Sequence, residues 1–209
     1  MENLRTRAYT GIKEKIINCT YAPGSFLDSI YLAQTLGMSR TPVREALTML
    51  EQEDLVTIVS QKGVMVQNIT LKNVRDVYAT REMIEPQMIL CYGKDIPKET
   101  LEDCRERLTV DMSSLPVEEV VELDDLLHKI IMHASDNSFI ILLFQKLCDQ
   151  NRRIQYMTRS LTERRRKNQD RHIEILDLML QEKLEEASEM MRSHLKESRE
   201  DAFRYMISH

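Results

Sequence analysis

The fold is decided by residues 39–47, Ser39-Arg40-Thr41-Pro42-Val43-Arg44-Glu45-Ala46-Leu47. Ser39 is expected to cap the following helix through its side chain, and Pro42 is tolerated within a first turn. Apolar side chains then recur at helical spacing through Leu50, which predicts a helix over residues 40–52 with one buried face. Arg40 and Arg44 lie four residues apart and therefore project from one side of this helix.

Helix and turn signals precede this stretch. Residues 4–19 carry apolar side chains at near-helical spacing and predict a first helix. Ala22-Pro23-Gly24-Ser25 stops it. Asp28 then caps a short second helix, which Gly37 closes.

Two β-like runs, residues 55–59 and 64–67, follow the helix over residues 40–52. Between them, Ser60-Gln61-Lys62-Gly63 is typical of a hairpin turn. The order helix, helix, tight turn, helix and hairpin is that of a winged helix-turn-helix, a module that binds DNA.

In such a module the first turn of the third helix enters the major groove. Arginine suits bidentate contact with guanine edges or phosphate, and hydroxyls and free amides of a first turn hold phosphate. Two arginines on a helix are otherwise ordinary solvated charges, but the ordered motif around them favours the DNA interpretation. The residues predicted to contact DNA are Ser39, Arg40, Thr41, Arg44, Lys62 and Gly63.

After Thr70 the sequence is helical in character to its end, so the predicted fold is mainly α. We expect a winged helix-turn-helix over residues 1–70 and an all-α helical bundle over residues 71–209. Pro86 should bend or break the first helix of the bundle. The predicted helices are residues 71–92, 98–110, 116–134, 138–158, 168–181 and 183–206.

Three histidines of the second part sit on apolar helix faces. Asp124 and His128 are four residues apart, so both point the same way, while His172 and His194 align with Leu and Met side chains on two other helices. Burying these groups without partners costs several kcal/mol, on the order expected for desolvated polar groups. A divalent metal resolves that cost, since imidazole and carboxylate are its normal ligands. Core histidines with backbone partners are the alternative, and the spacing leaves both open.

Residues 5–68, and above all Leu36–Leu47 and Lys62–Val66, closely resemble the GntR family of bacterial regulators. The resemblance implies a homodimer whose two recognition helices read the half-sites of a pseudo-palindromic operator in double-stranded DNA. The sequence departs from the family pattern at Asp54, where a glycine is usual before the first hairpin strand.

Residues 74–205 resemble the FCD type of ligand-binding domain, found in the FadR-type branch of that family. Arg81–Glu85 resembles its opening signature. The resemblance implies that a divalent metal and a small carboxylate effector bind within the bundle. Zinc is expected, and nickel, manganese and iron also suit such ligands. The implied metal ligands are Asp124, His128, His172 and His194.

Arg81 is the residue we predict to contact the effector. Its planar guanidinium suits a carboxylate. The alternative is an ion pair with Glu85, four residues on along the same helix, and such pairs are common.

Composition excludes several classes of protein. No apolar run reaches the ~20 residues needed to cross a membrane, and the first residues lack the apolar core of a secretion signal. The four cysteines form no Cys-x-x-Cys pair, which argues against a zinc ribbon and fits reduced thiols in the cytoplasm. The net charge of −5 argues against a chain that coats nucleic acid over its whole surface.

The sequence therefore predicts a ligand-responsive transcriptional regulator, taken to be a repressor, that acts in the cytoplasm. A metal sensor, in which the metal is itself the signal, is the main alternative. A metal-dependent hydrolase is a weaker one, because the sequence has no nucleophile motif and no phosphate-binding loop. We expect no enzymatic activity. The identity of the effector is open.

Overall fold

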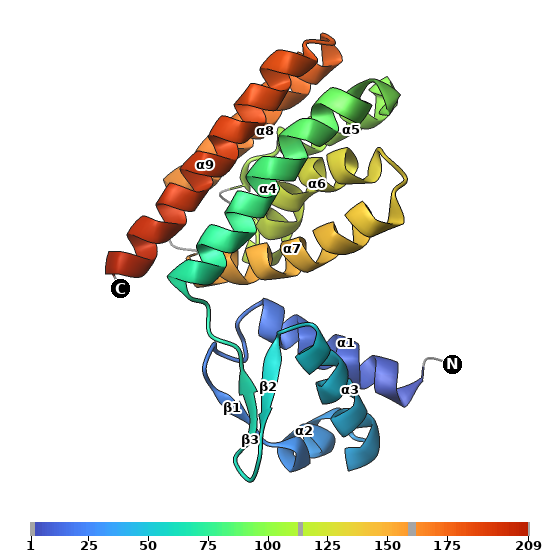
Figure 1. Ribbon diagram of the computed structural model, residues 1–209, viewed down its shortest axis with the longest axis vertical. Helices are drawn as coiled ribbons and strands as arrows, with labels where there is room; N and C mark the ends of the chain where they lie inside the picture. The colour runs from blue at the N-terminus through green and yellow to red at the C-terminus, as the bar shows by residue number, and fades with distance from the viewer. Residues whose placement is uncertain (1–2, 113–114, 159–161, 209) are drawn as a thin grey trace. The chain divides into compact units, whose positions relative to one another are not determined.

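The computed structural model describes residues 3–112, 115–158 and 162–208, with the side chains of residues 162–165 excepted (Figure 1). It divides the chain into two compact units, which we call unit 1 (residues 1–70) and unit 2 (residues 71–209). Each unit has its own core and is described by itself.

Unit 1 contains three helices and a small antiparallel sheet with strand order β1-β3-β2. Its core forms where the apolar faces of the helices meet the sheet, and residues such as Ile12, Leu50 and Val66 are fully buried there. The elements are α1 (Leu4–Ile17), β1 (Phe26–Leu27), α2 (Ser29–Leu36), α3 (Arg40–Gln52), β2 (Val56–Val59) and β3 (Gly63–Val66).

The two ends of α2 follow the capping chemistry of the sequence. Asp28 accepts hydrogen bonds from the backbone N–H groups of Ile30 (2.6 Å) and Tyr31 (3.0 Å), which starts α2. Gly37 ends that helix in a left-handed conformation, with φ at 63°. Ser39 precedes α3 with an extended backbone, but its side chain makes no capping hydrogen bond. The predicted side-chain cap at this position is therefore wrong, although α3 begins where expected.

The predicted hairpin is present, and a third strand joins it. In β1, Phe26 and Leu27 pair with Met65 and Val64 of β3, a contact that the sequence did not indicate. Gly63 has a φ of 104°, and a Cβ there would lie 3.1 Å from the Leu27 carbonyl oxygen. A glycine is therefore required at this position by the sheet itself.

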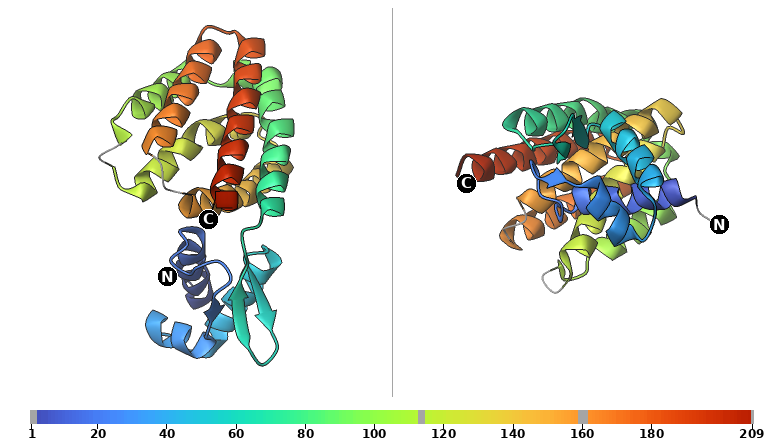
Figure 2. Two further views of the ribbon diagram at one scale, coloured as in Figure 1. Left: turned by 90° about the vertical axis from the view of Figure 1, so that its left-hand side faces the viewer. Right: turned by 90° about the horizontal axis from the view of Figure 1, so that it is seen from below.

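Unit 2 is all-helical, as predicted. α9 packs along α4 and against α8 (Figure 2). In the part of the chain that the structure describes, no helix is both long and apolar enough to span a bilayer. The elements are α4 (Leu71–Tyr92), the 3-10 turn η1 (Gly93–Asp95), α5 (Lys98–Leu108), α6 (Val117–His133), α7 (Ser138–Met157), α8 (Thr162–Leu180) and α9 (Leu184–Ser208).

Pro86 does not break α4, which runs unbroken from Leu71 to Tyr92, so the break allowed for in the sequence analysis is wrong. A proline removes the N–H that would bond to the carbonyl four residues earlier, which here belongs to Glu82. Arg192 of α9 donates to that carbonyl instead, at 3.3 Å. Ser188 of α9 donates to the carbonyl of Pro86 itself, at 2.9 Å. The neighbouring helix thus replaces the lost bond.

Candidate functional site

The recognition surface predicted from the sequence lies on the outer side of α3. Val43, Ala46 and Leu47 of this helix are buried in the core of unit 1, which turns Arg40 and Arg44 to solvent. Among the described residues neither arginine has a recorded ion pair. Their guanidinium groups are therefore available for contact with bases or phosphates.

The start of α3 also suits an anion. Ser39 and Thr41 are exposed, and no side-chain cap occupies the first-turn amides of the helix. Such amides bind phosphate readily. At the hairpin turn Lys62 is exposed, and its backbone N–H donates to the carbonyl of Val59 (3.1 Å), which fixes the turn. The structure therefore leaves these predicted DNA contacts accessible.

The three predicted histidines converge inside unit 2. His128 of α6, His172 of α8 and His194 of α9 are all buried, and each offers a ring nitrogen within 4.8 Å of the others. The Nε2 atoms of His172 and His194 lie 3.0 Å apart. Nε2 of His128 is buried and has no hydrogen-bond partner. Three elements distant in sequence thus bring their imidazoles to one point.

A buried ion pair supports this cluster from α4. Oε2 of Glu85 lies 2.6 Å from Nδ1 of His128, and Oε1 of Glu85 lies 2.5 Å from Nε of Arg81. Burial raises the pKa of the Glu85 carboxyl, but the charges of Arg81 and His128 outweigh it and lower that pKa to about 2. Glu85 is therefore ionised. The alternative considered for Arg81, an ion pair with Glu85, is present.

Two of the three imidazoles, those of His172 and His194, are held neutral. Burial lowers the pKa of His172 to about 4, although the charge of Asp124 acts in the opposite direction. Burial and the neighbouring imidazoles of His172 and His128 lower the pKa of His194 well below its usual value. Neutral imidazoles have a free lone pair, which is the form that coordinates a metal.

Asp124 lies apart from the three imidazoles. It is half-buried on α6, one turn before His128, and accepts a hydrogen bond from the amide of Gln155 on α7. It does not belong to the group of ligand atoms within 4.8 Å of one another. Its neighbour Asp125 is more deeply buried and pairs with Arg152 at 2.5 Å.

The cluster fits a metal ion on its own chemistry. Three buried imidazoles converge, and one of their nitrogens has no hydrogen-bond partner, which is costly unless something binds it. Imidazole nitrogen suits zinc and the later first-row metals. His128, His172 and His194 are therefore the residues that could hold a metal.

Both units match known protein families. Residues 4–66 match the gntR family of bacterial regulatory proteins, and residues 76–197 match the FCD domain. The chain is a GntR-family transcriptional regulator with an FCD domain. Its domains and relatives are those of transcriptional regulators, not enzymes.

Among the relatives of this regulator is the HTH-type regulator YdhC of Bacillus subtilis, 25% identical over 68% of this chain and 65% of its own length. The chain therefore matches slightly less than two thirds of that relative. The HTH-type transcriptional repressor RspR of Escherichia coli is 26% identical over 72% of this chain and 67% of its own length. A solved GntR regulator from Rhodococcus shares the fold, with a TM-score of 0.85 at 19% identity over 95% of this chain and 97% of that one.

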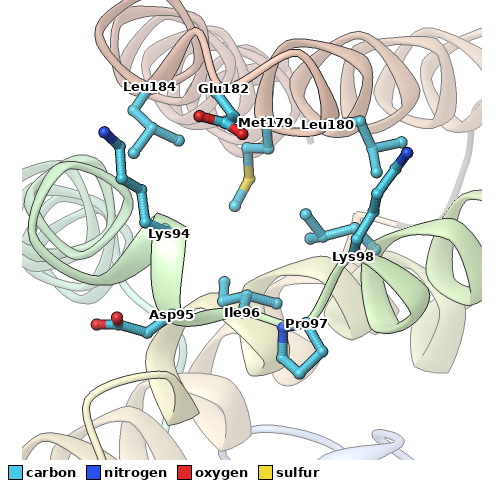
Figure 3. Close-up of a pocket in the computed structure, with 11 residues that line it drawn as sticks. Lys94, Asp95, Ile96, Pro97, Lys98, Met179, Leu180, Glu182 and Leu184 are labelled. Carbon is cyan, nitrogen blue, oxygen red and sulfur yellow. The ribbon is translucent and has the colours of Figure 1, made fainter.

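The regulator also has an open cavity of about 470 Å³ away from the histidines, where η1 and the start of α5 face the turn between α8 and α9. Figure 3 shows Lys94 and Lys98 on opposite sides of it, with Met179 pointing between them. None of the residues predicted from the sequence lines this cavity.

Two polar contacts in unit 2 of the regulator were not predicted from the sequence. Glu85 was expected to pair with Arg81 only, although its second carboxylate oxygen contacts His128, which lies 43 residues away along the chain. No partner was expected for Asp124, which accepts a hydrogen bond from Gln155. Both contacts cross between helices, so helical spacing alone carries no signal for them.

Proposed function

We propose that this regulator is a homodimeric repressor in the cytoplasm whose affinity for operator DNA is set by a divalent metal and a small carboxylate bound in unit 2. The observation that carries the proposal is the convergence of three buried imidazoles, one with an unbonded Nε2. Zinc is the metal we expect, because three imidazoles with a further open position suit it. Asp124, one turn before His128, is the proposed fourth ligand.

The charges around the cluster favour an anionic effector. Arg81 and Glu85 neutralise each other, and burial keeps the imidazoles of His172 and His194 uncharged. Of the proposed ligands only Asp124 is a carboxylate, so a divalent ion there leaves excess positive charge inside the bundle. Because a buried uncompensated charge is costly, a carboxylate is the natural further ligand. Arg81 remains the proposed contact for that carboxylate.

DNA binding is assigned to Ser39, Arg40, Thr41, Arg44, Lys62 and Gly63. Their exposure in unit 1 supports this, as does the GntR match over residues 4–66. Repression is proposed because relatives such as RspR are described as repressors. An effector alters operator affinity only if it binds two states of the dimer unequally. The proposed effector must therefore favour one state.

Elemental analysis tests the metal proposal. Protein purified without a metal-affinity tag or chelator should contain about one metal ion per chain. His172→Ala should lose it. His133→Ala is the matched control, because His133 is exposed and its Nδ1 lies 2.7 Å from the carbonyl of Lys129. Absence of metal from the wild-type protein, even after incubation with zinc, would disprove this part of the proposal.

Operator binding tests the DNA proposal independently. Arg40→Ala and Arg44→Ala should each weaken binding by about tenfold or more, since a bidentate contact with a base contributes about 1–3 kcal/mol. Arg204→Ala, an exposed arginine of α9, should leave binding unchanged. Unchanged affinity in both α3 variants would remove the assignment of α3 as the recognition helix.

A further inference from the structure

The buried carboxylate of Glu85 is outside the proposed set of metal ligands, yet it contacts one of them. Its Oε2 lies 2.6 Å from Nδ1 of His128, and each of the two side chains is 1% exposed. Its Oε1 lies 2.5 Å from Nε of Arg81. The carboxylate therefore has two buried partners: Arg81, which lies on the same helix α4, and His128, which lies on α6.

This contact determines which nitrogen of His128 carries hydrogen. The Glu85 carboxylate already accepts from Arg81 through Oε1, and its Oε2 accepts in the same way, so Nδ1 of His128 is the donor. An imidazole that ligates a metal keeps one ring hydrogen, and with that hydrogen on Nδ1 the lone pair is on Nε2. Nε2 is the buried atom without a hydrogen-bond partner. His128 offers one ring nitrogen to the cluster with His172 and His194, and because Glu85 occupies Nδ1, Nε2 is the nitrogen left for that role.

We propose that Glu85 is a positioning residue: it locks His128 in the tautomer and orientation that present Nε2 to the imidazole cluster, and Arg81 holds Glu85 in place. The inference rests on the proposed metal site and adds to it a carboxylate outside the ligand set. Carboxylates that orient a ligating histidine through its other nitrogen change metal affinity by about 10–100-fold when they are removed. Arg81 then acts on the site through Glu85.

Zinc affinity, measured by competition with a chelator, tests the inference. Glu85→Gln should weaken zinc binding by about 10–100-fold. Glu82→Gln is the matched control, because Glu82 lies on the same helix and pairs with Arg199 at 2.6 Å, a contact outside the imidazole cluster. This control should bind zinc as the wild type does. Equal affinity of Glu85→Gln and Glu82→Gln would overturn the inference.

Glu85→Gln leaves the buried Arg81 without its charged partner and could therefore lose zinc affinity by unfolding. A second variant distinguishes a loss of folding from a loss of the contact with His128. The double variant Arg81→Met/Glu85→Gln removes both charges from the interior. It should fold, as circular dichroism will report, and should show the same loss of zinc affinity. A folded double variant with wild-type affinity would overturn the role of Glu85.

A measurement on the metal-free protein separates this inference from the metal proposal. Long-range ¹H–¹⁵N NMR spectra should show His128 of the wild type with its hydrogen on Nδ1, and should show that preference weakened in Glu85→Gln. A hydrogen on Nε2 of wild-type His128 would overturn the inference. Failure of the wild type to bind zinc would disprove the metal site, while these spectra would still decide whether Glu85 sets the tautomer.

Discussion

Asp54 holds a left-handed backbone conformation, with φ at 57°, just before strand β2. This is the position where the sequence departs from the glycine usual in the family. A left-handed conformation costs an L-residue about 1 kcal/mol or more, and the extra freedom of glycine in the unfolded chain offsets part of the gain. Asp54→Gly should therefore raise the free energy of unfolding by about 0.5 kcal/mol, measured by urea denaturation.

The matched variant at this position is Asp54→Ala. Alanine retains the cost of the left-handed backbone and lacks the short polar side chain that eases it. Its free energy of unfolding should therefore fall below that of the wild type. If alanine stabilised unit 1 as much as glycine does, backbone strain would not be the cause.

The cysteines should differ in reactivity because their thiols differ in burial. Burial raises the pKa of the Cys104 thiol to about 12, whereas Cys91 is exposed. Only the thiolate reacts, so Cys104 should stay unmodified by iodoacetamide even at pH 9, far below its pKa. Mass spectrometry should find Cys91 alkylated in the folded protein and Cys104 alkylated only in urea. Rapid labelling of Cys104 in the native protein would contradict its burial in α5.

At the scale of the element, apolar periodicity and the residue types usual at helix ends made several helix bounds predictable. The helix expected over residues 40–52 is α3, Arg40–Gln52, and the one expected over residues 71–92 is α4, Leu71–Tyr92. α8 begins at Thr162, six residues before the predicted start, because the charged residues there have no apolar periodicity. β1 has only two residues and pairs across a long loop, so no local pattern marks it.

The candidate site was predictable in part, because apolar periodicity shows which face of a helix is buried. Apolar periodicity on three separate helices indicated that His128, His172 and His194 face inward, and they meet. The contact between Glu85 and His128 could not be predicted in this way, because it depends on how α4 packs against α6. Helical spacing finds the face on which a side chain lies, and packing decides which partner it meets.

The bond from Arg192 to the carbonyl of Glu82 should matter only because of Pro86. Arg192→Met should lower the free energy of unfolding by about 1 kcal/mol, the usual net contribution of a hydrogen bond. In a Pro86→Ala background the restored N–H can bond to the Glu82 carbonyl, so the same substitution should cost much less. Urea denaturation of the four proteins in this double-mutant cycle gives the coupling between the two positions.

Arg75→Met is the control for this cycle, because Arg75 lies on the same α4 helix and its recorded contacts are with the exposed side chain of Asp76. Its effect should be small and equal in both backgrounds, since exposed ion pairs contribute about 0–1 kcal/mol. A cost of Arg192→Met that is the same with proline and with alanine at position 86 would show that α9 does not replace the missing bond.

At the scale of the whole molecule, the arginines proposed to contact DNA and the imidazole cluster belong to different units. Each unit has its own core, so single substitutions should separate the two properties. His172→Ala should lose the thermal stabilisation by zinc, which for the wild type reaches about 2.7 kcal/mol when free zinc is 100 times the Kd. Scanning calorimetry with and without zinc measures this. Arg44→Ala should keep the full stabilisation.

Operator binding completes the separation. Without metal or effector, His172→Ala should bind the operator as the metal-free wild type does, because its substitution lies within unit 2. Arg44→Ala should bind about tenfold or more weakly under the same conditions, since its guanidinium belongs to the proposed contact with DNA. Fluorescence anisotropy at one fixed salt concentration makes the comparison valid, because phosphate contacts are strongly salt-dependent. Should His172→Ala weaken metal-free operator binding as much as Arg44→Ala does, the imidazole cluster would be needed to form the DNA-binding state itself, and a metal-dependent switch would have to act on the folding of unit 2.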